Sequence, residues 1–450
     1  MNVFTNYLLP QDAGTLFGDA ALCRAMLSFE STLAMAQVHE GVIPATAGRA
    51  IAAVCASLEL DPAALVEAGR HSGAMAVPLV AAIAQALQGT VPDAMRHLHY
   101  GATTQDVVDT AQVLMTRHAC TRLLAELDAC IGLLLPMARQ HQCTPMLART
   151  LLQPAQVTSW GLKCAQWAQP LQRSRDQLHT LSQHALVLQL GGAAGNLSTL
   201  AEAGDRVAAR MAAQLQLGCP DSSWHTQRDA WMRLGMEVAV LSGSLSKIAK
   251  DLALLSQAEV GEVFARDAHQ GGSSAMPHKR NPVACMQAVA ASIQVPHLAA
   301  TLLSTMSQAH ERALGEWQAE VAVWPQLWVQ AFGATSAIRD ALAGLHVDAA
   351  RMTHNIDQLQ GVIYSESIAH ALAAYLGKPQ AVSLVRALGA KALQSHTPLI
   401  ELLLADEALA VLVPAQRNAV RALCCPLLAV APSARLCGKL LQKCTESTCS

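Results

Sequence analysis

Residues 281–310 contain no Asp, Glu, Lys or Arg, and this run constrains the fold more than any other feature of the sequence. A helix of that length without charge must be covered by protein around most of its circumference. Gln, Ser, Thr, His, Asn and Pro interrupt the run, which is atypical of a membrane span of roughly 20 mostly apolar residues. We therefore expect a buried helix here, and similar helices over 177–201 and 321–338.

One chain offers few neighbours for so much apolar helix, so helices from other subunits are the natural cover. The sequence therefore predicts a homo-oligomer and no membrane association. The chain has 31 Lys and Arg against 33 Asp and Glu, a net charge of −2. A nucleic-acid partner would need a basic excess, so none is expected.

The composition favours an all-α protein. Hydrophobic residues make up 52% of the chain but aromatic residues only 4%, so most apolar side chains are aliphatic helix formers. Two sets of aliphatic residues step by three or four positions, as in helices packed along a seam: Leu123, Leu127, Ile131 and Leu134, and Leu241, Leu245, Ile248, Leu252 and Leu255.

We predict three helical domains. Residues 1–110 read as short helices with Pro and Gly punctuation, and 361–450 return to short helices with a turn at Gly377. The segment 111–360 reads as a bundle of long helices without β alternation.

The 13 cysteines are scattered and odd in number, so neither a disulfide framework nor a zinc ribbon is expected. The N-terminus lacks the charged and apolar regions of a signal peptide, which predicts a cytoplasmic protein. His97 and His99 favour capping or core polarity over a zinc site, so no metal and no cofactor are predicted.

Two polar segments interrupt the apolar sequence before residue 230. The first contains His99, Thr103, Thr104 and Gln105, and Thr103 with Asp106 forms a possible capping box. Free N–H groups at a helix start suit a carboxylate ligand, although a plain cap is the alternative. The second contains Gln227 and Arg228, whose donors suit an anion, although a solvated loop is the alternative.

The third polar segment, Gly271 to Pro282, carries the strongest signal. Asn281 followed by Pro282 reads as an N-cap and first-turn proline that open the charge-free helix. Ser273, Ser274 and Lys279 then stand beside a helix N-terminus, which suits an anion next to a proton-transfer group.

The sequence GSSAMPHKRNP in this segment resembles the signature loop of the fumarase/aspartase superfamily. GATTQDVVDT and WHTQRD resemble two further blocks of that family, and the resemblance covers roughly residues 10 to 440. It implies a homotetramer whose core is a 20-helix bundle and whose active sites are shared between subunits. It also implies Ser273 as the base and Lys279 and Asn281 as carboxylate ligands. The remaining substrate-binding residues that we assign are His99, Thr103, Thr104, Gln105, Arg149, Thr150, Gln153, Gln227, Arg228, Ser274, Met276 and Arg312.

The sequence departs from the family pattern at two positions. Leu151 stands where the family's acid-supplying His is expected, and Met286 stands where its Glu partner is expected. An apolar side chain cannot protonate a leaving group, so elimination by the usual route is not supported. An adenylosuccinate-type lyase with rearranged acid chemistry and a catalytically dead homologue are the alternatives.

A lactonising reaction tolerates the loss of that pair. The attacking group is then a carboxylate of the substrate itself, already ionised at pH 7 and tethered to its target. The segments HERALGEWQAE at 310–320 and LQLGGAAG at 188–195 also resemble the 3-carboxymuconate cycloisomerase branch of the superfamily. We therefore expect a tricarboxylate substrate that is closed to a lactone.

Overall fold

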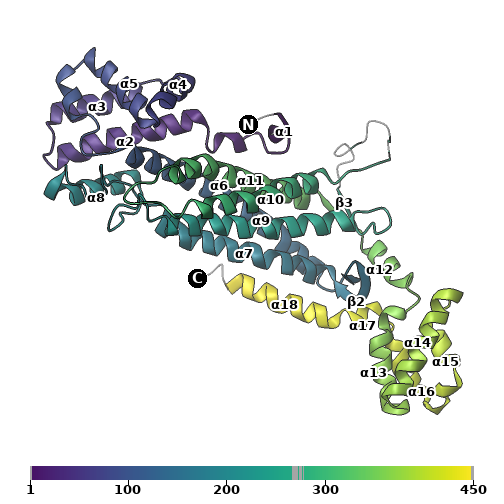
Figure 1. The fold of residues 1–450 in the computed structure, drawn as a ribbon. Helices are drawn as coiled ribbons and strands as arrows, with labels where there is room; N and C mark the ends of the chain where they lie inside the picture. The colour runs from purple at the N-terminus through teal and green to yellow at the C-terminus, as the bar shows by residue number, and fades with distance from the viewer. Residues whose placement is uncertain (1–2, 266–271, 273–275, 277, 447–450) are drawn as a thin grey trace. The chain divides into compact units, whose positions relative to one another are not determined.

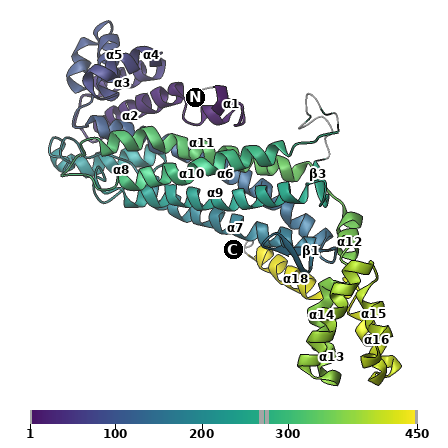
Figure 2. The same cartoon turned by 45° about the vertical axis from the view of Figure 1, so that its right-hand side comes forward.

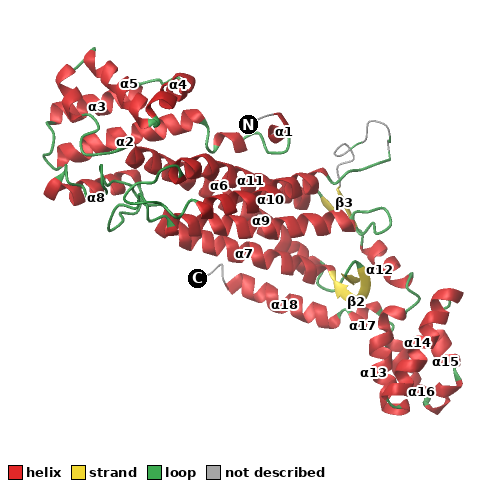
Figure 3. Ribbon diagram, in the orientation of Figure 1, coloured by secondary structure: helices red, strands yellow, loops and turns green. Residues whose placement is uncertain are grey.

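A computed structural model gives the fold of residues 3–265, 272, 276 and 278–446. Helices make up most of the described chain, and strands occur in two small pairs (Figure 3). The all-α prediction is therefore confirmed.

The N-terminal elements are short except for one helix of 21 residues. They are α1 (Val3–Asn6), η1 (Ala13–Thr15), α2 (Asp19–His39), α3 (Ala45–Ser57), α4 (Pro62–Ser72), α5 (Ala76–Gln88) and η2 (Pro92–His97). Pro and Gly punctuate them as expected, because Pro44 precedes α3 and Gly73 ends α4 with a left-handed backbone at φ 69°.

Long helices dominate the middle of the chain, as predicted. They are α6 (Thr104–Gln140), α7 (Trp160–Ala185), α9 (Asp229–Leu255), α10 (Val283–Ser304) and α11 (Glu316–Ala343). The shorter elements η3 (Ala201–Ala203) and α8 (Gly204–Leu215) lie between α7 and α9 in the sequence. The predicted seam residues from Leu123 to Leu134 and from Leu241 to Leu255 are all buried.

Short helices return after residue 348, and Gly377 separates two of them as predicted. They are α12 (Ala349–Asp357), η4 (Val362–Tyr364), α13 (Ser365–Leu376), α14 (Lys378–Ser395), α15 (Leu399–Ala405), η5 (Glu407–Val411), α16 (Pro414–Ala422), α17 (Pro426–Ala429) and α18 (Ala431–Glu446). Their apolar faces enclose a core of their own that includes Ile368, Leu399 and Leu403.

The expectation that 111–360 contains no strand is wrong. β1 (Pro145–Thr150) pairs antiparallel with β2 (Gln153–Ser159), and β3 (Val263–Ala265) pairs antiparallel with β4 (Leu345–Val347). Each strand is three to seven residues long. Such short strands carry too few alternations to be recognised in the sequence.

The expectation of a helix over 177–201 is only partly right. α7 ends at Ala185, and the residues up to Leu200 form a loop. The two glycines at 191 and 192 lie in that loop, and glycine disfavours a continuous helix. The expectation for 321–338 is confirmed, since this part of α11 is mostly buried.

The charge-free helix α10 starts at Val283, one residue later than predicted. The carbonyl of Pro282 accepts the first helical bond from Met286 N at 2.9 Å, so Pro282 rather than Asn281 holds the N-cap position. Within one chain α10 buries a stripe that includes Cys285, Val295 and Leu302. Length and composition alone would let this helix cross a membrane, which is weak evidence for a single helix.

The chain divides into two compact units. The first comprises 1–128, 173–246 and 287–337, and the second comprises 129–172, 247–286 and 338–450. Within the first unit, α6, α9, α10 and α11 run side by side in both views (Figures 1 and 2). Within the second unit, α13 and α14 pack against each other.

A buried ion-pair cluster joins three helices of the first unit. Arg228, which precedes α9, donates from Nη1 to Asp109 Oδ2 of α6 at 2.8 Å and from Nε to Glu320 Oε2 of α11 at 3.0 Å. Burial by itself lowers the pKa of Arg228, but the charges of Asp109 and Glu320 hold it above its ordinary value. The guanidinium also stacks 4.3 Å from the ring centre of Trp224.

Aromatic packing adds to this cluster. The rings of Trp231 on α9 and Trp324 on α11 are stacked with their centres 3.9 Å apart. Trp324 Nε1 donates to Thr116 Oγ1 of α6 at 2.8 Å, so its polar edge is satisfied inside the core. The first unit is thus held by both a charge cluster and an indole stack.

We predict that Arg228→Gln lowers the free energy of unfolding by about 3–5 kcal/mol, because it leaves two buried carboxylates without their counter-charge. Chemical denaturation followed by circular dichroism measures the loss. The control is Arg233→Gln, which removes an exposed pair with Asp229 and should cost at most about 1 kcal/mol. Equal losses for the two variants would contradict this account of the cluster.

Candidate active site

The predicted helix start in the first polar segment is confirmed, because α6 begins at Thr104. Asp106 Oδ2 accepts from Thr103 N at 3.0 Å, which is one half of the predicted capping box. The hydroxyl of Thr103 instead accepts from Nη1 of Arg312, which lies 209 residues further along the chain. An exposed cation and a hydroxyl therefore meet at a helix N-terminus, where anions are stabilised.

The carboxylate of Asp106 holds together three separate segments. Besides Thr103, it accepts from Gly191 N and Gly192 N at 2.9 Å each and from His225 Nε2 at 2.7 Å. Gly192 has φ 70°, and a Cβ there would lie 2.9 Å from the carbonyl oxygen of Gly101. The close approach of these loops therefore requires glycine.

Gln105 is buried and participates in the same network rather than facing solvent. Its Nε2 donates to the carbonyl of His225 at 2.9 Å and to Asp109 Oδ2 at 3.2 Å. Gln189 adds a second amide, which donates to Asp109 and accepts from Trp224 N at 3.1 Å. These amides connect the first two polar segments.

Arg228 and Gln227 occupy different environments although they are neighbours. Arg228 is buried between two carboxylates, so it has no unpaired charge to offer an anionic substrate. Burial raises the pKa of Glu320, and Arg228 only partly offsets this. Gln227 is exposed and lines a cavity of about 420 Å³. The structure thus gives Arg228 a supporting position and leaves Gln227 accessible.

His99 lies at the edge of the same network. Its Nδ1 is 2.6 Å from Glu30 Oε1 of α2, and its backbone has φ 55°. Burial lowers the pKa of His99, but the hydrogen bond and charge of Glu30, with the charge of Asp106, raise it above its ordinary value. This imidazole is therefore held protonated to higher pH than an isolated one.

The residues matching the family's acid-supplying block lie in the second unit, on the β1–β2 hairpin. Arg149 forms a two-point pair with buried Glu262, from Nη2 to Oε1 at 2.7 Å and from Nη1 to Oε2 at 3.0 Å. Thr150 pairs with Gln153 across a two-residue turn made of Leu151 and Leu152.

The turn between β1 and β2 has a backbone conformation that leucine rarely adopts. Leu151 and Leu152 have φ 51° and 65°, which is the geometry of a type I′ turn that normally selects Asn and Gly. Their exposed fractions are 96% and 72%. Two apolar side chains are thus presented to the outside on a backbone that disfavours them.

Part of the signature loop is described, also in the second unit. Lys279 and Met276 are exposed, and the backbone N–H of Lys279 donates to the carbonyl of Met276 at 3.0 Å. The described residues supply no ion-pair partner for Lys279. Asn281 is half-buried and Met286 is exposed. Ser273 and Ser274 lie outside the described residues.

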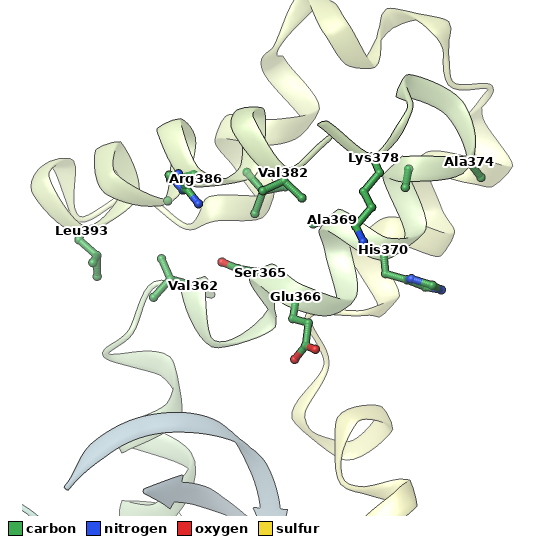
Figure 4. Close-up of a pocket in the computed structure, with 13 residues that line it drawn as sticks. Val362, Ser365, Glu366, Ala369, His370, Ala374, Lys378, Val382, Arg386 and Leu393 are labelled. Atoms are coloured by element: carbon green, nitrogen blue, oxygen red, sulfur yellow. The ribbon is translucent and has the colours of Figure 1, made fainter. Parts of the chain in front are cut away.

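A larger cavity lies elsewhere in the described chain, between α13 and α14. It has about 970 Å³ and is lined by apolar residues together with Glu366, His370, Lys378 and Arg386. In Figure 4 the side chain of Lys378 reaches toward the helix that carries His370. No residue that the sequence assigns to the site lines this cavity.

Several supporting residues escaped the sequence analysis. Asp109 and Glu320 lie within segments that resemble family blocks. Asp109 follows Asp106 by three positions and Glu320 follows Trp317 by three, so each pair shares one face of a helix, which could have suggested a buried network. Glu30 had no such signal, since it is a single acidic residue 69 positions from His99. Only the folded arrangement reveals that pair.

Comparison with known proteins gives the family. A family model described as Lyase matches residues 14–296. The 3-carboxy-cis,cis-muconate cycloisomerase of Bradyrhizobium diazoefficiens is 43% identical to this chain, and the match covers 86% of each protein. The enzyme of the same name from Pseudomonas aeruginosa is 40% identical, and the match covers 85% of this chain and 84% of the relative.

Comparison with solved structures gives the same branch of the family. The 3-carboxy-cis,cis-muconate lactonizing enzyme from Pseudomonas putida has a TM-score of 0.92 and 34% identity, and the match covers 99% of each chain. The resemblance inferred from the signature loop is therefore confirmed, and the chain is an enzyme that belongs to the lyase family of the fumarase/aspartase superfamily, in its cycloisomerase branch.

Proposed function

We propose that the protein is a 3-carboxy-cis,cis-muconate cycloisomerase that converts its tricarboxylate substrate to 4-carboxymuconolactone in protocatechuate breakdown. The observation that carries this proposal is the exposed apolar pair at the hairpin tip, where Leu151 replaces the family's acid-supplying His. Elimination needs that acid for its leaving group, whereas ring closure has no separate leaving group.

The substrate supplies its own nucleophile in this reaction. A carboxylate is ionised at pH 7, and its tethering to the alkene gives an effective molarity of about 10⁵ M or more. Charge then develops on the carbon next to a second carboxylate. Lys279, whose ammonium has no ion-pair partner among the described residues, and the N-terminus of α6 with Arg312 are suited to stabilise that charge.

We assign Ser273, or a group acting through it, to proton delivery, and Lys279 to the developing carbanion. The proposed substrate-binding residues with exposed or half-buried side chains are His99, Thr103, Thr104, Thr150, Gln153, Gln227, Met276, Asn281 and Arg312. Gln105, Arg149 and Arg228 are engaged with buried partners, so we propose that they shape the site. Ser274 keeps its assignment from the signature loop.

We also propose that the chain forms a homotetramer with shared active sites and acts in the cytoplasm without a cofactor. In the single chain, α10 exposes Met286, Ile293 and Leu303, an apolar surface that supports burial against other subunits rather than in a membrane. Every cysteine that the structure describes is a free thiol, which supports a reducing compartment. The division into domains 1–110, 111–360 and 361–450 remains part of this proposal.

The activity is tested with 3-carboxymuconate in the presence of EDTA. We expect loss of the conjugated-diene absorbance at an unchanged rate with and without the chelator, because no step needs a metal. Adenylosuccinate is tested in parallel, and turnover of adenylosuccinate alone would replace this proposal by an elimination reaction.

The signature-loop roles predict separate kinetic effects. Ser273→Ala should lower kcat by about 10²-fold or more, since proton transfer is lost. Lys279→Met should lower kcat/KM, because it removes a charge that acts on the bound anion. Lys391→Met, on the exposed surface of α14, is the control and should match the wild type. A wild-type kcat in Ser273→Ala would remove that residue from proton transfer.

The tetramer is tested on α10. Ile293, which is 57% exposed in the single chain, should be buried in the assembly, so Ile293→Asp should shift sedimentation velocity toward smaller species. Val66→Asp, at an exposed apolar position on α4, is the matched control and should leave the tetramer intact. An active wild-type monomer at micromolar concentration would contradict the proposal.

A further inference from the structure

The contact between His99 and Glu30 joins two parts of the first unit that are far apart in sequence. Glu30 lies on α2 and is only 1% exposed, and its Oε1 is 2.6 Å from His99 Nδ1. The side chain of His99 is 22% exposed. A buried carboxylate thus holds one ring nitrogen, while part of the side chain remains exposed.

This contact fixes which nitrogen can exchange a proton. Glu30 accepts the Nδ1–H, so the second titrating proton of the imidazole belongs to Nε2. The described residues provide no hydrogen-bond partner for Nε2. A carboxylate that orients a histidine in this way is the arrangement that general acids and bases use.

The backbone at His99 supports a functional reason for the contact. Its φ of 55° places a non-glycine residue in the left-handed region, which costs on the order of 1 kcal/mol. Gln37 of α2 donates to the carbonyl of the next residue, Tyr100, at 2.6 Å and holds the turn in place. Two contacts from α2 therefore keep the imidazole beside the N-terminus of α6.

The charges that surround His99 come from more than one element. Glu30 faces it from α2, and Asp106 acts on it from α6. The loop 191–200, which packs on Gly101, carries no charged residue. Arg312 reaches Thr103 nearby and adds a positive charge that suits the substrate's carboxylates.

We propose that His99, oriented by Glu30, delivers the proton to carbon in the ring closure, an inference that rests on the proposed function. A substrate carboxylate oxygen forms the new C–O bond to one alkene carbon, and the π electron pair moves to the neighbouring carbon beside a carboxylate. That carbon takes the Nε2 proton of His99. The imidazole regains a proton from water, so one proton is consumed per lactone. In this step the proton comes from His99 rather than from Ser273.

The pH profile of kcat/KM tests the pair. Because the protonated imidazole is the active form, kcat/KM of the wild type should fall as pH rises through the raised pKa of His99. Glu30→Gln keeps the shape but removes the charge, so burial then lowers that pKa. The descending limb should therefore move to lower pH by about one unit or more, and activity should recover on acidification.

A second variant does not depend on Glu30. His99→Gln should lower kcat by about 10²-fold or more and abolish the descending limb of the pH profile, because the variant has no proton donor at this position. His179→Gln, at an exposed position on α7, is the control and should keep both the rate and the limb. Circular dichroism and sedimentation verify that each variant is folded and assembled.

The outcomes separate this inference from the proposed function. If wild-type enzyme leaves 3-carboxymuconate unchanged, the proposed function fails and the inference fails with it. If the wild type is active but the limb stays in place in folded Glu30→Gln, or kcat survives in His99→Gln, only the inference is overturned. If Glu30→Gln does not fold, the rate and limb of His99→Gln decide the question.

Discussion

Two carboxylates on the first turns of α6, those of Asp106 and Asp109, organise the whole neighbourhood of the candidate site. Asp106 accepts four hydrogen bonds from the loop before α6, the glycine loop and His225. Asp109 accepts from Arg228 and from the indole of Trp317 at 2.8 Å. A buried anion must be matched by donors. Each segment that supplies a hydrogen-bond donor to Asp106 or Asp109 is therefore held against α6.

This arrangement distinguishes polar side chains that bind other protein groups from polar side chains that remain exposed to solvent. Arg228 and Gln105 look in the sequence like ligands for an anion, but they bind buried protein groups. Lys279 and Arg312, which we propose as substrate ligands, are exposed instead. Water can hydrate such charges in the empty site, which costs less than burying an unpaired cation.

The sequence predicted the elements whose signals are long. The helical class, both aliphatic seams and the helix starting at Thr104 followed from periodicity and capping, because such patterns extend over many residues. The β1–β2 hairpin was missed because a Leu-Leu turn lacks the residues that mark type I′ turns. The burial of Arg228 and the partner of His99 depend on contacts between distant segments, which no local pattern encodes.

The hairpin tip has a consequence for how this family changes its chemistry. Leu151 projects from a turn whose shape is set by the strands on either side, and its side chain contributes almost nothing to the packing of its own chain. A replacement there leaves the scaffold intact. Natural selection can therefore exchange a proton donor for an inert group at this position without a compensating change elsewhere in the fold.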